Sequence, residues 1–292
     1  MRHISPVLLG LSLAVFGSSI SPAQQDAASS SSMPKVLQIT REFVKPGKAG
    51  MTHDKSEGVF VAAFQQAKWP THYVALTSLS GKSRALYFTP YPSFDAWEKD
   101  TAAQAKNASL SAALDKAIVS DGDLLDGLDQ AVAVYSEEMS YHAKPDLSHA
   151  RFLDLSVYHV RPGHQKDWSD LVKLVISGYQ KAGTPAHWAM FNMVYGRPGG
   201  DYLVLSSKAS MTELDAEFGD KNFEKALGEE GMKKLSELEA ASVDTIDHEL
   251  FAISPHQSYV DDAWIKADPD FWGPKPATGA AESAMEEKPA KP

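Results

Sequence analysis

The sequence predicts an α+β protein made of two tandem ferredoxin-like βαββαβ repeats, packed sheet to sheet as an intramolecular pseudo-dimeric α+β barrel. A strand-like run that ends in Lys45-Pro46-Gly47-Lys48 is matched by a second one that ends in Arg161-Pro162-Gly163-His164. A period of about 100 residues indicates two copies of a small domain rather than a solenoid. The split βαβ order leaves one face of each sheet bare, and two bare faces bury each other in a barrel with the helices outside.

The first repeat is expected over residues 35–145. It begins with a strand over Val36–Val44, and apolar residues between Phe60 and Ala67 then recur at helical spacing up to the break at Trp69-Pro70. Ser93 has the position of a helix N-cap. The remaining expected strands are residues 72–79, 84–89 and 131–141.

The second repeat is expected over residues 146–255 and has the same order of patterns. Its first helix is indicated by helical spacing between Trp168 and Tyr179, and Ser210 is a cap residue like Ser93. Strands are expected over residues 187–195, 201–206 and 242–253. Aligning the last strands places Glu138 opposite Glu249 as equivalent positions.

The two ends of the chain differ in composition from the repeats. Residues 1–23 have a basic start, an apolar run over 7–16 and small residues before Gln24, which predict a signal peptide and an exported protein, periplasmic or extracellular. An uncleaved anchor is the alternative, although the run is shorter than the roughly 20 residues of a spanning helix. The other expected segments are a disordered linker over 24–34, a C-terminal strap over 256–272 and a disordered tail over 273–292.

Charge and cysteine content exclude several classes of partner and chemistry. The net charge is −10, and an acidic protein repels nucleic acid and anionic lipid, so neither is an expected partner. The sequence contains no cysteine, which excludes disulfides, thiolate metal ligands and cysteine nucleophiles. No second apolar run could span a membrane.

The order of elements, the Pro-Gly turn after the first strand and the aromatic-rich second helix resemble the dimeric α/β barrel superfamily. That superfamily includes antibiotic-biosynthesis-monooxygenase-like, NIPSNAP-like and stress-responsive barrel domains, and the resemblance covers residues 35–255. It implies a barrel formed within one chain, as in duplicated members. Functions in the superfamily range from cofactor-free oxygenation and haem degradation to no known catalysis, so the fold does not decide the function. No cofactor is predicted from the residues, and the resemblance leaves haem open.

Two histidines, His72 and His187, are candidate catalytic residues because each precedes a large aromatic residue at the start of an equivalent strand. Either could serve as a general base, a proton donor or a haem ligand. The alternative is a structural hydrogen bond that recurs in both repeats. No two histidines form the i, i+4 pair of a helical zinc site, so no metal is predicted.

Acidic residues on the first helix of each repeat are expected on a solvated outer face. Their neighbours are polar and their spacing is helical. The residues concerned are Asp54, Glu57, Asp167 and Asp170.

Alternating strand residues are expected to line the inside of the barrel, where aromatic and methionine side chains suit a flat apolar ligand. The alternative is that these side chains fill the space between the sheets. The predicted ligand-binding residues are Tyr73, Tyr87, Tyr135, Tyr158, Trp188 and Met190.

These patterns favour an exported barrel protein that binds a small apolar or aromatic molecule or has a noncatalytic role. One alternative is a cofactor-independent monooxygenase or haem-handling enzyme of the same superfamily. Another is an envelope interaction module that uses the aromatic residues of the strap, such as Trp264 and Trp272. Enzymatic activity is left undecided. A monomeric pseudo-dimer is expected, with further self-association left open.

Overall fold

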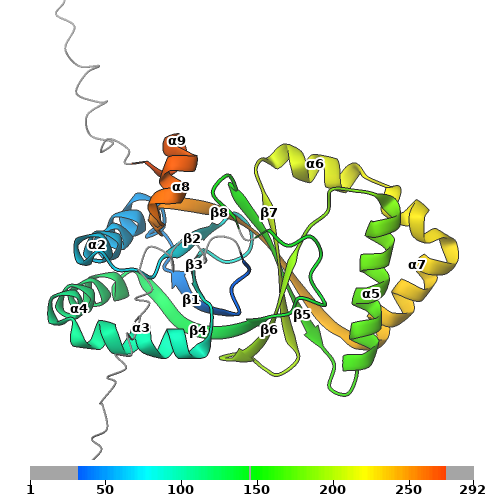
Figure 1. Ribbon diagram of the computed structural model, residues 1–292, viewed down its shortest axis with the longest axis horizontal. Coiled ribbons are helices and arrows are strands. Elements are labelled where there is room, and N and C mark those ends of the chain that lie inside the picture. Colours follow the sequence, from blue (N-terminus) through cyan, green and yellow to red (C-terminus); the bar gives the residue numbers. More distant parts are fainter. Residues whose placement is uncertain (1–31, 145, 274–292) are drawn as a thin grey trace, which may run out of the picture.

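The computed structural model describes residues 32–144 and 146–273. Within these ranges eight strands form a closed barrel, and the helices lie outside it on two opposite sides (Figure 1). The expected signal peptide, nearly all of the expected linker, and the tail beyond Gly273 lie outside the described residues. None of the described helices is both long and apolar enough to cross a membrane.

Both halves of the barrel contain the same order of elements, with two helices before the last strand. The first half consists of β1 (Val36–Val44), α2 (Met51–Ala67), β2 (Tyr73–Ser78), β3 (Arg84–Tyr91), α3 (Phe94–Lys106), α4 (Ala108–Gly122) and β4 (Leu125–Tyr135). The second half consists of β5 (Phe152–Val160), α5 (Gln165–Ala182), β6 (Ala189–Tyr195), β7 (Asp201–Lys208), α6 (Met211–Gly219), α7 (Asn222–Ser242) and β8 (Val243–Tyr259). Two short helices follow, α8 (Asp262–Ala267) and α9 (Pro269–Trp272).

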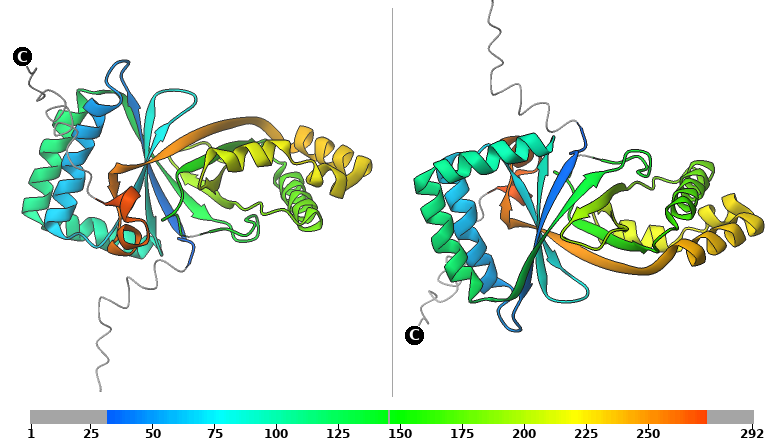
Figure 2. Two further views of the ribbon diagram at one scale, coloured as in Figure 1. Left: turned by 90° about the horizontal axis from the view of Figure 1, so that it is seen from above. Right: turned by 90° about the horizontal axis from the view of Figure 1, so that it is seen from below.

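The barrel is built from two four-stranded antiparallel sheets that join at both edges. Its strand order is β1-β3-β2-β8-β5-β7-β6-β4, so β2 pairs with β8 and β4 pairs with β6 where the halves meet. The predicted α+β barrel is therefore confirmed. The register also shifts at matching places, between Phe43 and Val44 in β1 and between His159 and Val160 in β5. Figure 2 shows the helices of the two halves on opposite sides of this barrel.

The last strand of the first half differs from the prediction. Strand β4 spans Leu125–Tyr135 rather than residues 131–141, and Glu138 lies in the turn that follows it. Glu249 is paired inside β8, opposite Leu155, so Glu138 and Glu249 are not equivalent. The start of β4 was missed because acidic residues and Gly127 interrupt its apolar alternation, and pairing with β1 makes it a strand regardless of that composition.

Side chains from alternate strand positions fill the barrel interior. Leu37 and Ile39 of β1, Leu76 of β2, Phe191 of β6 and Phe251 of β8 are each no more than 4% exposed and belong to one core cluster. Packing at this density leaves interior side chains in contact with one another on all sides. The filled interface is thus the arrangement that the structure shows.

The C-terminal segment closes against this core. Trp264, Ile265 and Phe271 pack on the barrel cluster, and Trp272 belongs to it. The indole Nε1 of Trp272 donates a hydrogen bond to the Ser148 carbonyl oxygen at 2.7 Å. The aromatic residues of α8 and α9 therefore pack against the protein as a strap, and β8 continues to Tyr259, beyond the expected end of the second repeat.

Candidate metal centre

A buried polar cluster lies between the sheet and the helices of the first half, on the opposite side of the sheet from the barrel core. Leu37 and Ile39 of β1 face the core, and side chains alternate along a strand, so Glu42 points outward to the helices. The aliphatic and aromatic residues that surround it exclude water. Glu42 is only 6% exposed.

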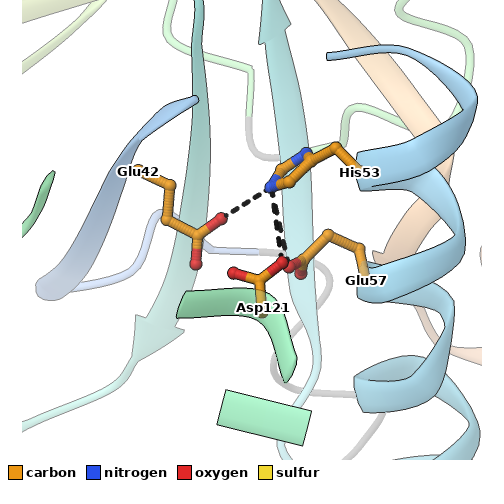
Figure 3. Close-up of side chains that lie close together, drawn as sticks. All are labelled: Glu42, His53, Glu57 and Asp121. Carbon is orange, nitrogen blue, oxygen red and sulfur yellow. Dashed lines mark hydrogen bonds and ion pairs between the residues drawn. The ribbon is translucent and has the colours of Figure 1, made fainter. Parts of the chain in front are cut away.

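Three further side chains meet Glu42 from the helix layer. His53 and Glu57 lie one turn apart on α2, and residues at i and i+4 share a helix face. Asp121 comes from the last turn of α4. All three are buried, and Figure 3 shows the four side chains converging from β1, α2 and α4.

The four side chains are close enough to share one small ion. His53 Nε2 lies 3.1 Å from Glu42 Oε2, 3.8 Å from Glu57 Oε1 and 3.8 Å from Asp121 Oδ1. One ligand atom from each residue lies within 4.8 Å of all the others. A tetrahedral ion with bonds of about 2.0–2.2 Å holds neighbouring ligand atoms roughly 3.3–3.6 Å apart, which is close to the spacing found here.

Two of the carboxylate oxygens are buried without a hydrogen-bond partner, Glu57 Oε1 and Asp121 Oδ1. Both point into the cluster (Figure 3). Burial and the nearby carboxylates of Glu42 and Asp121 raise the pKa of Glu57 to about 9. Buried carboxylates need a cation or a proton, because an isolated buried charge is far too costly.

Tyrosine residues border the cluster on the sheet side. The Tyr87 hydroxyl donates to Glu42 Oε2 at 3.2 Å, and the Tyr73 ring lies edge-on to the Tyr87 ring at 6.0 Å. Burial is the main cause that raises the pKa of both phenols, so both are neutral. Helix α2 is also tied to β8, since Gln257 Nε2 donates to Asp54 Oδ1 at 2.5 Å.

The two predicted catalytic histidines lie in different surroundings from each other and from this cluster. His187 is buried, with Nε2 2.9 Å from the Ser207 carbonyl oxygen and Nδ1 3.4 Å from that of Pro185. Burial is the main cause that lowers its pKa. His72 stacks on Tyr259 at 4.7 Å, and Tyr259 packs with the first-half helices. A catalytic role of either histidine remains a prediction.

The six predicted ligand-binding residues do not share one wall of the barrel. Tyr135 packs against the barrel core. Tyr73 and Tyr87 pack together outside it, and Tyr158, Trp188 and Met190 belong to the cluster under the second-half helices. The expected inward orientation is thus wrong for these five, because strand alternation predicts which residues share a face but not which face is inside. Ligand binding by the six is untested.

Glu57 corrects the expectation of a solvated acidic face, since it is 3% exposed. Asp54 is half-buried and bonded to Gln257, whereas Asp167 and Asp170 form ion pairs at the surface, as expected. The cluster was missed because only His–His pairs were considered as helical metal ligands. The i, i+4 pair of His53 and Glu57 was the available signal, but Glu42 and Asp121 join it only in the folded chain.

Comparison with solved structures supports the fold class. A "Putative monooxygenase" from Fusobacterium nucleatum subsp. nucleatum matches with a TM-score of 0.51 at 13% identity, over 76% of this chain and 93% of that chain. An anthrone oxidase-like protein matches with a TM-score of 0.48 at 13% identity, covering 80% and 96% of the two chains. A chlorite dismutase variant from Candidatus Nitrospira defluvii matches at 0.45 and 10% identity, covering 77% and 93%.

The fold is that of the dimeric α/β barrel superfamily, as the strand order and the first of these structures show. At such identities the likeness concerns the fold alone. No family model matches the chain, and no curated protein matches it in sequence.

Proposed function

We propose that this protein is an exported metal-binding barrel protein in which Glu42, His53, Glu57 and Asp121 hold one divalent cation. The observation that carries the proposal is the pair of buried, unpartnered oxygens, Glu57 Oε1 and Asp121 Oδ1, aimed at the same point as His53 Nε2. A cation at that point would satisfy both oxygens and balance the carboxylate charge.

The donor set favours a borderline first-row ion. Three carboxylates and one imidazole suit manganese, iron or zinc, whereas soft ions such as Cu(I) prefer sulfur ligands, and the sequence contains no cysteine. The ligands come from β1, α2 and α4, so the ion would cross-link the sheet to both helices. Such an ion adds its binding free energy to the stability of the folded state.

A metal ion fits the structure better than the ligands considered from the sequence. The barrel interior is filled by its own side chains, which supports an ion over an apolar molecule as the bound species. A haem needs an axial ligand with room beside it for the macrocycle. His53 has three carboxylates within 3.8 Å, and His187 is packed against Ser207, so neither position fits a haem.

Export and descent by duplication are part of the same proposal. The composition of residues 1–23 supports export, and the repeated element order with matching register shifts supports a duplicated ancestral unit. Only the first unit carries the acidic cluster. One ion per chain is therefore expected.

The test is metal binding by the chain from residue 24 onward, first treated with a chelator and then given Mn²⁺ or Zn²⁺. Native mass spectrometry should show one bound ion per chain, and Co²⁺ in its place should give the visible absorption bands of a site with nitrogen and oxygen ligands. His53→Gln and Asp121→Asn should lose the ion.

Matched controls are His187→Gln, a buried histidine elsewhere, and Asp100→Asn, a carboxylate that accepts from Trp69, Thr71 and Tyr91. Both controls should bind the ion like the unaltered protein. Absence of a mass increase, or equal binding by His53→Gln, would overturn the proposal.

A further inference from the structure

The metal centre is closed to substrates, and this inference rests on the function proposed above. Its four ligand residues are 2–6% exposed, and helices α2 and α4 cover them. A catalytic metal site keeps an open position for water or substrate, whereas a closed one does not. Electron transfer needs no such open position, since the donor and acceptor do not have to touch.

The charge of the ligands favours a trivalent ion. Three ionised carboxylates and a neutral imidazole carry a charge of −3. A divalent ion leaves one net negative charge in the buried site, and a trivalent ion leaves none. Because burial penalises net charge, the oxidised form of an ion such as iron is the better matched of the two.

A row of aromatic rings leads away from the centre. The Tyr87 hydroxyl is bonded to Glu42, and ring centroids are 6.0 Å apart from Tyr87 to Tyr73 and 6.3 Å apart from Tyr73 to Tyr259. The Tyr259 ring is 4.7 Å from that of His72, which is partly exposed. The row thus connects a buried ligand to the surface near the start of β2.

We infer that the centre is an electron-transfer site for iron, with Tyr87, Tyr73 and Tyr259 as the path to an acceptor that docks near His72. Bound Fe²⁺ becomes Fe³⁺, and the electron reduces a one-electron acceptor such as an electron-carrier protein. No covalent bond forms or breaks, and the Tyr87 proton stays between its own oxygen and Glu42. The residues along the path are positioning groups rather than catalytic residues.

The test loads the chelator-treated protein with Fe²⁺ without oxygen and mixes it with hexachloroiridate(IV), a one-electron acceptor, in a stopped-flow spectrometer. We expect one equivalent of acceptor to be reduced per bound iron, with the appearance of a high-spin Fe³⁺ signal in electron paramagnetic resonance. Tyr73→Phe should remove the fast phase, because phenylalanine keeps the ring packing but is much harder to oxidise.

The matched control is Tyr91→Phe, since Tyr91 is a buried tyrosine that donates to Asp100 in a different cluster. It should keep the fast phase. Asp121→Asn, which removes one negative charge, should raise the reduction potential of any iron that still binds.

Native mass spectrometry of the same samples separates the two proposals. If no Fe²⁺ binds, the metal-binding function itself fails. If Fe²⁺ binds but is not oxidised, or if Tyr73→Phe and Tyr91→Phe react alike, only the electron-transfer inference is overturned.

Discussion

The two helix–sheet interfaces of this barrel have the same architecture but opposite chemistry. Helices α2 and α5 both end at a left-handed C-cap, Lys68 and Gly183. Counting back equally from these caps places His53 opposite Trp168 and Glu57 opposite Val172.

The strands show the same contrast. Glu42 and Tyr158 each precede the valine at the register shift of β1 or β5 by two residues. In the second half, Tyr158, Trp168 and Val172 pack in one apolar cluster, with the rings of Tyr158 and Trp168 5.0 Å apart. In the first half the corresponding positions form the acidic centre.

The difference shows that the scaffold accepts either solution at this interface. Apolar packing stabilises the second half without any other species. The acidic cluster cannot do this, because buried carboxylates need protons or a cation. We therefore expect pH and metal ions to act on the first half, and loss of side-chain volume to act most strongly on the second.

The largest expected effect is a dependence of stability on pH in the metal-free protein. The pKa of Glu57 is raised from 4.5 to about 9, so the folded state holds a proton that the unfolded state releases. Its contribution to stability is fully present below pH 4.5 and is lost as the pH rises through 9. Denaturant unfolding with a chelator present should show this loss.

Glu57→Gln provides the control, because the amide cannot ionise and has nearly the same shape. Its unfolding free energy should change much less over the same pH range. An equally steep dependence in Glu57→Gln would assign the effect to other groups.

The next largest effect is expected from Trp168→Ala in the second half. Removing a buried tryptophan costs about 3–5 kcal/mol, through lost burial and the cavity left behind. Trp168 is 2% exposed and contacts Tyr158 and Tyr202. The unfolding free energy should fall by the same amount with and without Mn²⁺, since the metal site is in the other half.

A loss that Mn²⁺ restores in Trp168→Ala would show that the two interfaces are coupled. The barrel strands are shared by both halves, so this outcome would change the comparison rather than the fold.

A smaller effect is expected when metal is added to the unaltered protein. At a free Mn²⁺ concentration 100 times the dissociation constant, binding to the folded state alone adds about 2.7 kcal/mol to the unfolding free energy. His53→Gln should remove this gain, whereas His187→Gln should keep it. Thermal unfolding measured over a series of Mn²⁺ concentrations tests both variants.

Local sequence patterns were sufficient for much of the fold. The strand Val36–Val44, the two Pro-Gly turns and the helices between the strands have periodic apolar residues and turn residues that act over a few positions. Strand β4 was placed too late in the chain, because its first residues are polar and only pairing with β1 makes them a strand.

The candidate site was much less accessible to the same reasoning. Glu57 was assigned to a solvated face because its sequence neighbours are polar, yet α4 covers it in the folded protein. Tyr87 and Trp188 were placed inside the barrel, where a choice between two faces had no support from the sequence.

The sequence by itself determined the repeated order of elements, and hence the α+β barrel, because helical and strand periodicity are local properties of the chain. It also determined which chemistry is excluded, through the absence of cysteine. Only the tertiary structure decided that the barrel is filled and that Glu42, His53, Glu57 and Asp121 share one buried point. The physical reason is that burial and proximity between distant residues depend on how β1, α2 and α4 pack, and no local pattern records that packing.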